Sequence, residues 1–414
     1  AAFRPRVDRA ALVMPGSGPS AEDFPFLRIQ FFDQELENFE YDTKNFTTAL
    51  EWKPSDDLRL YFDATVNDQE RTQESTRVQI SGVASSAVVD STNNTSFETV
   101  NLGTLDGPNG PINLGTVQAA LTGTLGVGVD SNGVIDPNLR TSSNTGARDT
   151  DSRVFALGTE WNATDQLTVR AEASLSTSES VFPNFSTTMD FINPNGPQPE
   201  FGVSLDNGVP TEFDLRGGKL QFGLDQASPF APTKAQILDP ANYRLQQVTQ
   251  GADSTDNEEK AARVDLSYDT SQVVPFVTSI DFGYRWNENS ATNNEATNNV
   301  SFTNSTRHWN RPSGDLFSDL LIAGPDNFND ADGRRLYFPD FLIIDGGRAY
   351  DNPTQVLDSL NGAIAASNAS ASVGDPIASL ETPTESAAGF FTIEGNTNAG
   401  SLQTKFATEI RGAP

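Results

Sequence analysis

The chain has 414 residues, of which 56 are acidic and 27 are basic, and its formal net charge is −29. A charge of this sign and size repels phosphate backbones and anionic membrane surfaces, so it argues against a nucleic-acid partner. The chain contains no cysteine and one histidine. Disulfides, thiol catalysis and zinc sites built from cysteine or histidine clusters are therefore excluded.

The N-terminal segment, residues 1–25, is punctuated by proline and glycine and mixed in charge. We expect it to be irregular, and it lacks the apolar core of a signal peptide. A first strand is predicted at residues 26–32. No run of about 18 apolar residues follows anywhere in the chain, so no transmembrane helix is expected.

The first predicted hairpin spans residues 46–67. Apolar and polar residues alternate through Phe46, Leu50 and Trp52, and again from Leu58 onward, with a turn at 53–57 between the two runs. Side chains on a strand point to opposite faces with period two, so one face is apolar and the other is charged.

Two further hairpins follow. The second repeats the signature of the first, because Leu50-Glu51-Trp52, the turn and Leu58 correspond to Thr159-Glu160-Trp161, a turn at 162–166 and Leu167. The third lacks the Glu-Trp pair and is predicted from the alternation in 262–268 and 280–286, around a turn at 269–275.

Long polar stretches separate the hairpins. Residues 68–153, 177–260 and 288–335 are rich in Asn, Ser, Thr, Gly, Pro and Asp, and we predict them to be long loops. They exceed ordinary loop lengths, so they are expected to be functional or partly structured. Strand-like pieces occur within them at 77–83, 121–129 and 219–224.

The C-terminal part contains more varied patterns. An apolar run at 336–344 is a possible strand, although Pro339 argues against a central position in a sheet. Residues 353–364 have the apolar spacing of a short helix. Residues 366–400 are predicted to be loop, and the alternation in 402–410 predicts a last strand.

These patterns predict an all-β, antiparallel protein, with residues 26–414 forming the β-region. In a soluble sandwich the apolar faces would pack on a second sheet, whereas in a complete or partial transmembrane β-barrel they would face lipid. Three features favour the barrel. The turns at one end are short, the loops at the other end are long, and Trp52 and Trp161 lie beside the turns. The charged face would then line its interior, with these residues: Arg59, Asp63, Arg170, Glu172, Arg263, Asp265, Asp281 and Arg285.

Three segments resemble the barrel of TonB-dependent outer-membrane receptors. They are residues 45–70, with the Trp-x-Pro-x-Asp-Asp turn, the similar copy at 161–176, and 261–289. The resemblance rests on strand pattern and turn style. We recognise neither a plug domain nor an energy-coupling box in residues 1–44, and residues 411–414 lack a final aromatic residue. We therefore expect an internal portion of such a barrel, or a relative without a plug.

The resemblance implies a non-enzymatic receptor or transporter in the cell outer membrane of a Gram-negative bacterium. It would take up a scarce nutrient, such as a metal chelate, glycan or peptide, and its partners would be the surrounding lipid and a TonB-type energy-coupling protein. The alternative is a soluble extracellular adhesin, matrix or filament subunit, which the acidic, Asn- and Thr-rich composition also fits. A third hypothesis, a surface enzyme acting on glycans, has no carboxylate pair singled out by spacing.

No catalytic or cofactor-binding residue is predicted, and the residues of any metal site stay unknown. Calcium is possible at two carboxylate- and amide-rich segments, Asn327 to Gly333 and Asp130 to Asp136, although neither has EF-hand spacing and both suit plain turns. His308 and Trp309, beside Arg307 and Arg311, either contact a ligand at the barrel mouth or pack within a loop.

Overall fold

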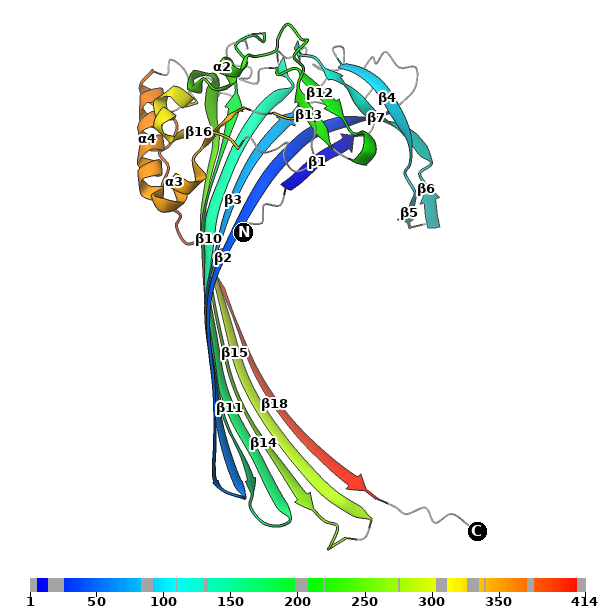
Figure 1. Cartoon of the computed structure of the whole chain (residues 1–414), viewed down its shortest axis with the longest axis vertical. Coiled ribbons are helices and arrows are strands. Elements are labelled where there is room, and N and C mark those ends of the chain that lie inside the picture. Colours follow the sequence, from blue (N-terminus) through cyan, green and yellow to red (C-terminus); the bar gives the residue numbers. More distant parts are fainter. Residues whose placement is uncertain are drawn as a thin grey trace.

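The computed structural model describes residues 6–13, 26–82, 92–108, 110–129, 133, 135–197, 208–218, 220–274, 276–302, 311–325, 335–338, 340–370 and 376–407. Seven long strands dominate it and lie side by side in chain order (Figure 1). Each is antiparallel to its neighbours. They are β2 (Phe26–Ser55), β3 (Leu58–Ser81), β10 (Asn138–Asn162), β11 (Leu167–Phe191), β14 (Tyr243–Asp269), β15 (Val277–Ser301) and β18 (Phe391–Phe406).

The three predicted hairpins are confirmed as β2–β3, β10–β11 and β14–β15. Their turns are short and gather at one end of the sheet, the lower end in Figure 1. The connections from β3 to β10, from β11 to β14 and from β15 to β18 are much longer and lie at the upper end. The predicted asymmetry of turns and loops is therefore present.

The strands extend well into the segments predicted to be loops. Strand β3 continues to Ser81 and β10 begins at Asn138, within 68–153, and the other strands likewise extend into 177–260 and 288–335. The alternation fades there because both faces become polar. The strands stay paired there through backbone hydrogen bonds and through cross-strand hydroxyl pairs such as Thr150–Ser180, at 3.2 Å between the oxygens.

Two other expectations also differ from the structure. Residues 1–25 were expected to be irregular, but β1 (Arg6–Val13) pairs with the upper part of β2. Residues 366–400 were expected to be loop, but α4 (Pro353–Ser370) continues into them and β18 begins at Phe391. The helix predicted at 353–364 and the last strand are confirmed, whereas the described residues of the apolar run at 336–344 contain only the short strand β17 (Leu342–Ile344).

Smaller elements gather around the upper end of the sheet (Figure 1). The remaining strands are β4 (Thr92–Asn101), β5 (Thr104–Gly107), β6 (Gly110–Asn113), β7 (Thr116–Leu125), β8 (Gly128–Val129), β9 (Ile135–Asp136), β12 (Thr211–Asp214), β13 (Gln221–Leu224) and β16 (Leu321–Ala323). The other helices are α2 (Lys234–Ile237) and α3 (Gly346–Asp351), with 3-10 turns η1 (Arg216–Gly218), η2 (Pro240–Asn242) and η4 (Gly314–Leu320).

The main sheet is open. Its strands follow the order β13, β12, β7, β2, β3, β10, β11, β14, β15, β18, and no strand among the described residues joins its two ends. The antiparallel β-sheet is as predicted, but of the two expected forms, a complete or a partial barrel, the complete barrel is not formed by these residues. The molecule is instead a curved antiparallel sheet with a helical cluster at its upper end (Figure 1).

The strand register assigns the side chains to two faces. Face 1 carries Trp52, Leu60 and the residues directly opposite them, and face 2 carries Glu51, Arg59 and their opposite residues. At the upper end, face 1 holds the main core, in which one row of fully buried residues crosses five strands. The members of this row are Phe32, Ile80, Leu139, Phe191 and Tyr243.

This row is covered from two parts of the chain: Phe213 of β12 and Phe222 of β13 pack on Phe32, and the described residues of 311–380 cover the other end of the row. Leu342 accepts a hydrogen bond from Thr141 Oγ1 through its carbonyl (2.8 Å) and donates one to the Tyr243 hydroxyl (3.1 Å). Helix α3 packs against β3, β10 and β11. Face 1 is thus covered at its upper end, which raises the question of what its lower part contacts.

No described helix is long and apolar enough to span a membrane.

Candidate functional site

The lower part of face 1 is an exposed apolar surface, which we call the apolar band. One of its rows runs across six strands without a polar residue. Three of its six side chains are well exposed, with 48% of Trp161, 47% of Phe282 and 74% of Leu402 accessible, and the other three are half-buried. The row consists of Leu58, Trp161, Val169, Leu266, Phe282 and Leu402. Soluble monomers rarely expose apolar surfaces of this extent.

The apolar band has a defined height. On β3 it extends from Leu58 to Val66, which at a rise of roughly 3.3 Å per residue is about 26 Å. Above it the same face becomes charged, with Asp68 and Glu70 on β3 and Asp149 on β10. A band of about 25 Å bounded by polar residues is typical of outer-membrane strands.

Aromatic residues mark the lower edge of the band. Trp52 and Trp161 lie beside the short turns, as predicted, and Tyr268 and Phe406 lie at the same end of their strands. All four are more than two-fifths exposed. Tryptophan and tyrosine favour the boundary between hydrocarbon and water, because their rings are apolar and their polar atoms need hydration.

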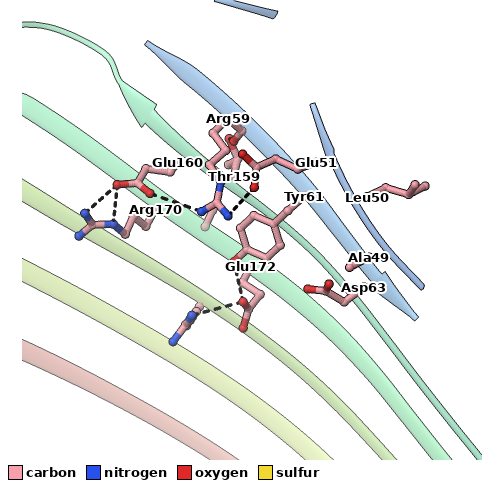
Figure 2. Close-up of a pocket in the computed structure, with 12 residues that line it drawn as sticks. Ala49, Leu50, Glu51, Arg59, Tyr61, Asp63, Thr159, Glu160, Arg170 and Glu172 are labelled. Carbon is pink, nitrogen blue, oxygen red and sulfur yellow. Dashed lines mark hydrogen bonds and ion pairs between the residues drawn. The ribbon is translucent and has the colours of Figure 1, made fainter. Parts of the chain in front are cut away.

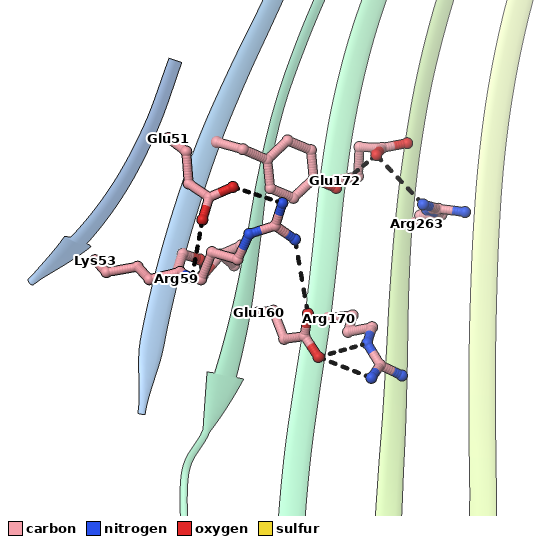
Figure 3. Close-up of polar contacts among 9 residues, drawn as sticks. Glu51, Lys53, Arg59, Glu160, Arg170, Glu172 and Arg263 are labelled. Carbon is pink, nitrogen blue, oxygen red and sulfur yellow. Dashed lines mark hydrogen bonds and ion pairs between the residues drawn. The ribbon is translucent and has the colours of Figure 1, made fainter. Parts of the chain in front are cut away.

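Face 2 at the same height carries a ladder of alternating charges (Figure 3). Arg59, Glu160 and Arg170 lie directly opposite one another on β3, β10 and β11. Arg170 forms two hydrogen bonds to Glu160 Oε1, at 2.8 and 3.2 Å, and Arg59 donates to Glu51 on β2 at 2.8 Å. Lys53 extends the ladder, at 3.1 Å from Glu51.

A second set of contacts lies beside this ladder (Figures 2 and 3). The Tyr61 hydroxyl donates to Glu172 at 2.6 Å, and Arg263 approaches the same carboxylate oxygen at 3.3 Å. The Tyr61 ring lies over Gly158, where an added Cβ would come within 2.1 Å of it. Gly158 is therefore required for Tyr61 to reach across β10 to β11.

These two sets of residues line a shallow hollow of about 430 Å³ on face 2 (Figure 2). Its carboxylates at Glu51, Glu160 and Glu172 are each paired with arginine. Because these three carboxylates are neutralised, the hollow offers a passing solute mainly hydrogen bonds, together with the carboxylate of Asp63. No nucleophile with an adjacent base is present in its lining, which also contains Ala49, Leu50, Asp63, Thr159 and Ala171.

A buried ion cluster lies at the upper end of face 2. Asp190 accepts a hydrogen bond from Arg140 (2.9 Å) and from Arg311, and the side chains of Asp190 and Arg311 are at most 2% exposed. Sequence reasoning missed this cluster. Its three members lie in three different segments that were predicted to be loops, and no local pattern connects them.

Carboxylates also gather on face 1 above the apolar band. The Tyr350 hydroxyl on α3 donates to Glu70 at 2.8 Å, and this hydrogen bond raises the pKa of Tyr350 to about 12. Burial raises the pKa of Asp149, and the nearby charges of Glu70, Asp68 and Asp151 raise it further. The strand region above the band is therefore strongly acidic.

The charged residues predicted to line one face are all on face 2. The calcium candidate at 327–333 and both His308 and Trp309 lie outside the described residues, as does much of 130–136. Within the described part of the chain, no group of three or more His, Cys, Asp or Glu side chains is arranged to hold a metal ion.

Comparison with known proteins gives no further guide to function. No protein-family model matches the chain, and no curated protein or solved structure matches it.

Proposed function

We propose that the chain forms the membrane wall of an outer-membrane receptor or transporter of the TonB-dependent type, which takes up a scarce nutrient. The apolar band is the observation that carries this proposal. It combines apolar side chains on several adjacent strands, a height of about 26 Å and aromatic residues at its lower edge. In this role the chain is a partial barrel located in the cell outer membrane of a Gram-negative bacterium.

The band is better matched to lipid than to water or to a second protein layer. Burying apolar surface contributes roughly 25 cal/mol per Å², so leaving residues such as Leu157 and Leu402 in water is costly. These two side chains are 60% and 74% exposed, while the upper part of the same face is covered by the chain itself. The lower part of face 1 therefore needs an apolar environment that the described residues do not supply.

Face 2 would line the aqueous interior. Its paired charges and its hollow suit a surface that guides a hydrated ligand by hydrogen bonds and holds it weakly. The transporter would be non-enzymatic, and a TonB-type energy-coupling protein would be its partner on the short-turn side. The ligand class stays open among metal chelates, glycans and peptides.

One observation favours a second function, an extracellular filament or matrix subunit. The sheet is open, and outer strands such as β18 present an uncovered edge among the described residues. Exposed edges are templates for pairing with other chains. Extraction separates the two functions, because a matrix subunit is released from cells by salt or chelator, whereas a membrane wall needs detergent.

Two single-cysteine variants test the membrane proposal, since the chain has no native cysteine. Leu157→Cys places a thiol in the middle of the apolar band, and Ala156→Cys is its neighbour on face 2. In outer-membrane vesicles opened to the reagent on both sides, a water-soluble maleimide should label Ala156→Cys and spare Leu157→Cys, while a lipid-soluble maleimide should label Leu157→Cys. Labelling of Leu157→Cys from water, in protein released without detergent, would overturn the proposal.

A further inference from the structure

Two arginines lie directly opposite each other on face 2, above the ladder of alternating charges. They are Arg71 on β3 and Arg148 on β10, which are partners in the strand register. Both are on face 2, because Arg71 and Arg59 are separated by an even number of positions on β3. Like charges placed directly opposite each other on a sheet are destabilising, so strand pairing alone gives no reason for this arrangement.

Neither arginine is neutralised by a carboxylate. Among the described residues, Arg71 and Arg148 form no ion pair, whereas the arginines around the hollow are each paired with a glutamate. Arg71 donates a side-chain hydrogen bond to a neutral acceptor, Gln73 Oε1, at 3.1 Å. The chain has 56 acidic and 27 basic residues, so this lack of a counter-ion does not come from a shortage of carboxylates.

Three carboxylates are close to the pair in the strand register, but none of them neutralises it. Glu70 and Asp149 are its neighbours in sequence and lie on face 1, on the other side of the sheet. Asp253 is on face 2, but it lies on β14 opposite Phe182 of β11, two strands away from Arg148. The two guanidinium groups are therefore available to an anion that does not belong to the described residues.

Aromatic rings take the place of counter-ions at both guanidinium groups. The guanidinium carbon of Arg71 lies 4.9 Å from the ring centre of Phe39 and 6.0 Å from that of Tyr41, both on β2. The guanidinium carbon of Arg148 lies 5.0 Å from the ring centre of Phe182 on β11. Contacts of this kind attract the cation to the ring and leave N–H groups free to bind an anion. The two groups thus lie toward opposite strands, with β3 and β10 between them.

The position of the Phe182 ring depends on Gly146, which precedes Arg148 on the same face of β10. A Cβ added at Gly146 would come within 3.2 Å of the Phe182 ring and within 2.9 Å of the Pro183 carbonyl oxygen. A larger residue at this position would therefore displace the ring that contacts Arg148. The local sequence keeps the ring and the guanidinium group together.

We propose that Arg71 and Arg148 form a binding site for the carboxylate or phosphate groups of an anionic ligand, which lies across β3 and β10 on face 2. A guanidinium group presents its N–H donors in a planar fork that matches the oxygens of both anions. The bound anion also offsets the repulsion between the two cations. The ligand thus supplies the counter-charge that the described residues do not.

The proposed function gives this site a place on the route of uptake. On β3, Arg71 lies about 16 Å beyond Val66, the last residue of the apolar band, at a rise of roughly 3.3 Å per residue. A ligand that enters from the end with the long connections would meet the two arginines before it reaches the hollow. This role rests on the proposed function, whereas the anion site itself does not. It narrows the nutrient to chelates, glycans or peptides that carry carboxylate or phosphate groups.

Calorimetric titration of the full chain in detergent micelles tests the site, with citrate and inorganic phosphate as separate probes. At least one probe should bind the parent chain, and the probe that binds more tightly identifies the group that the ligand carries. Arg71→Gln and Arg148→Gln should each weaken binding by about tenfold or more, because each removes charge-assisted hydrogen bonds. Arg148→Lys keeps the charge without the planar fork, so its loss of affinity should be smaller than that of Arg148→Gln.

Arg285→Gln is the matched control, since it removes an exposed arginine from face 2 on β15, far below the pair. In about 0.1 M salt, where charges are screened over roughly 10 Å, it should change affinity by less than about twofold. Denaturant titration of each variant checks that it is folded. The proposal is overturned if neither probe binds the parent, or if Arg285→Gln weakens binding as much as Arg71→Gln does. Loss of the membrane role alone would appear in the labelling of Leu157→Cys, while anion binding in micelles persisted.

Discussion

At the scale of single residues, Asp190 has the largest expected effect on stability. Among the described residues it is the only carboxylate in contact with the buried Arg311, and it also binds Arg140. The Nε and one terminal nitrogen of Arg311 have no hydrogen-bond partner in the described part of the chain. The stability of the fold around Arg311 therefore depends on the negative charge of Asp190, because a buried cation without a counter-ion is strongly unfavourable.

We expect Asp190→Asn to lower the free energy of unfolding by about 3–5 kcal/mol, since it leaves Arg311 buried without a paired anion. Denaturant titration in detergent micelles measures this change. Asp165→Asn, in the exposed turn between β10 and β11, is the control and should change stability by less than about 0.5 kcal/mol. Equal effects of the two variants would show that the ion cluster is not a stabilising unit.

Asp149 should give a pH-dependent effect of the opposite sign. Its pKa is raised in the folded protein by partial desolvation of the carboxylate and by the charge of Glu70, so its charged form opposes folding once the pH exceeds the ordinary value of 3.8. Asp149→Asn should therefore stabilise the protein at pH 7, by no more than about 0.5 kcal/mol at this exposed site. The gain should disappear below pH 3, where the carboxyl is protonated in both states. A gain that is the same at both pH values would contradict this account.

At the scale of elements, the sheet is organised by contacts across strands. Tyr61 on β3 passes over Gly158 on β10 to reach Glu172 on β11, so one side chain connects three strands. The same three strands are linked by the ladder through Arg59 and Glu160. Cross-strand contacts of this kind fix register, because a one-residue slip would move every member to the opposite face.

Gly158→Ala should disrupt this arrangement. The added methyl group would overlap the Tyr61 ring, so the ring must move and lose its 2.6 Å hydrogen bond to Glu172. We expect a loss of about 1–3 kcal/mol in unfolding free energy, as for other overpacked sites. Gly400→Ala is the matched control, since its nearest neighbour beyond the adjacent residues lies 4.0 Å from the added carbon. Tyr61→Phe removes the hydroxyl that bonds to Glu172. In that background the difference in unfolding free energy between Gly158→Ala and Gly400→Ala should be smaller.

At the scale of the whole molecule, one sheet face has two different environments. Its upper part is covered by β12, β13 and the described residues of 311–380 and forms the core, while its lower part is the exposed apolar band. The opposite face is charged along the same lower region. This distribution underlies the proposed membrane role, in which an apolar medium meets the lower part of face 1.

Arginine substitutions on the two faces should therefore have opposite consequences. Leu157→Arg places a charge in the middle of the band and should cost about 2–4 kcal/mol if the band faces lipid. Ala156→Arg, on face 2, should be tolerated within about 0.5 kcal/mol. Folding into vesicles, followed by denaturant titration, measures both. A Leu157→Arg variant that folds as well as the parent, or is more soluble without detergent, would argue for a protein in water.

The sequence alone determined the three hairpins, the short turns and the separation of charged from apolar side chains. These depend on period-two alternation and local turn residues, which are properties of neighbouring positions. Trp52 and Trp161 could be placed beside the turns for the same reason. The upper limits of the strands could not be predicted, because residues such as Thr150 and Ser180 are polar on both faces and remain extended only through pairing across the sheet.

Tertiary structure alone decided that the sheet is open and which residues meet from distant segments. The contact of Asp190 with Arg140 and Arg311, and the covering of Tyr243 by Leu342, join positions that no local pattern relates. Whether the outer strands meet also depends on the number and directions of all strands together. Alternation specifies the two sides of each strand, but only the assembled sheet specifies what lies beside its edges.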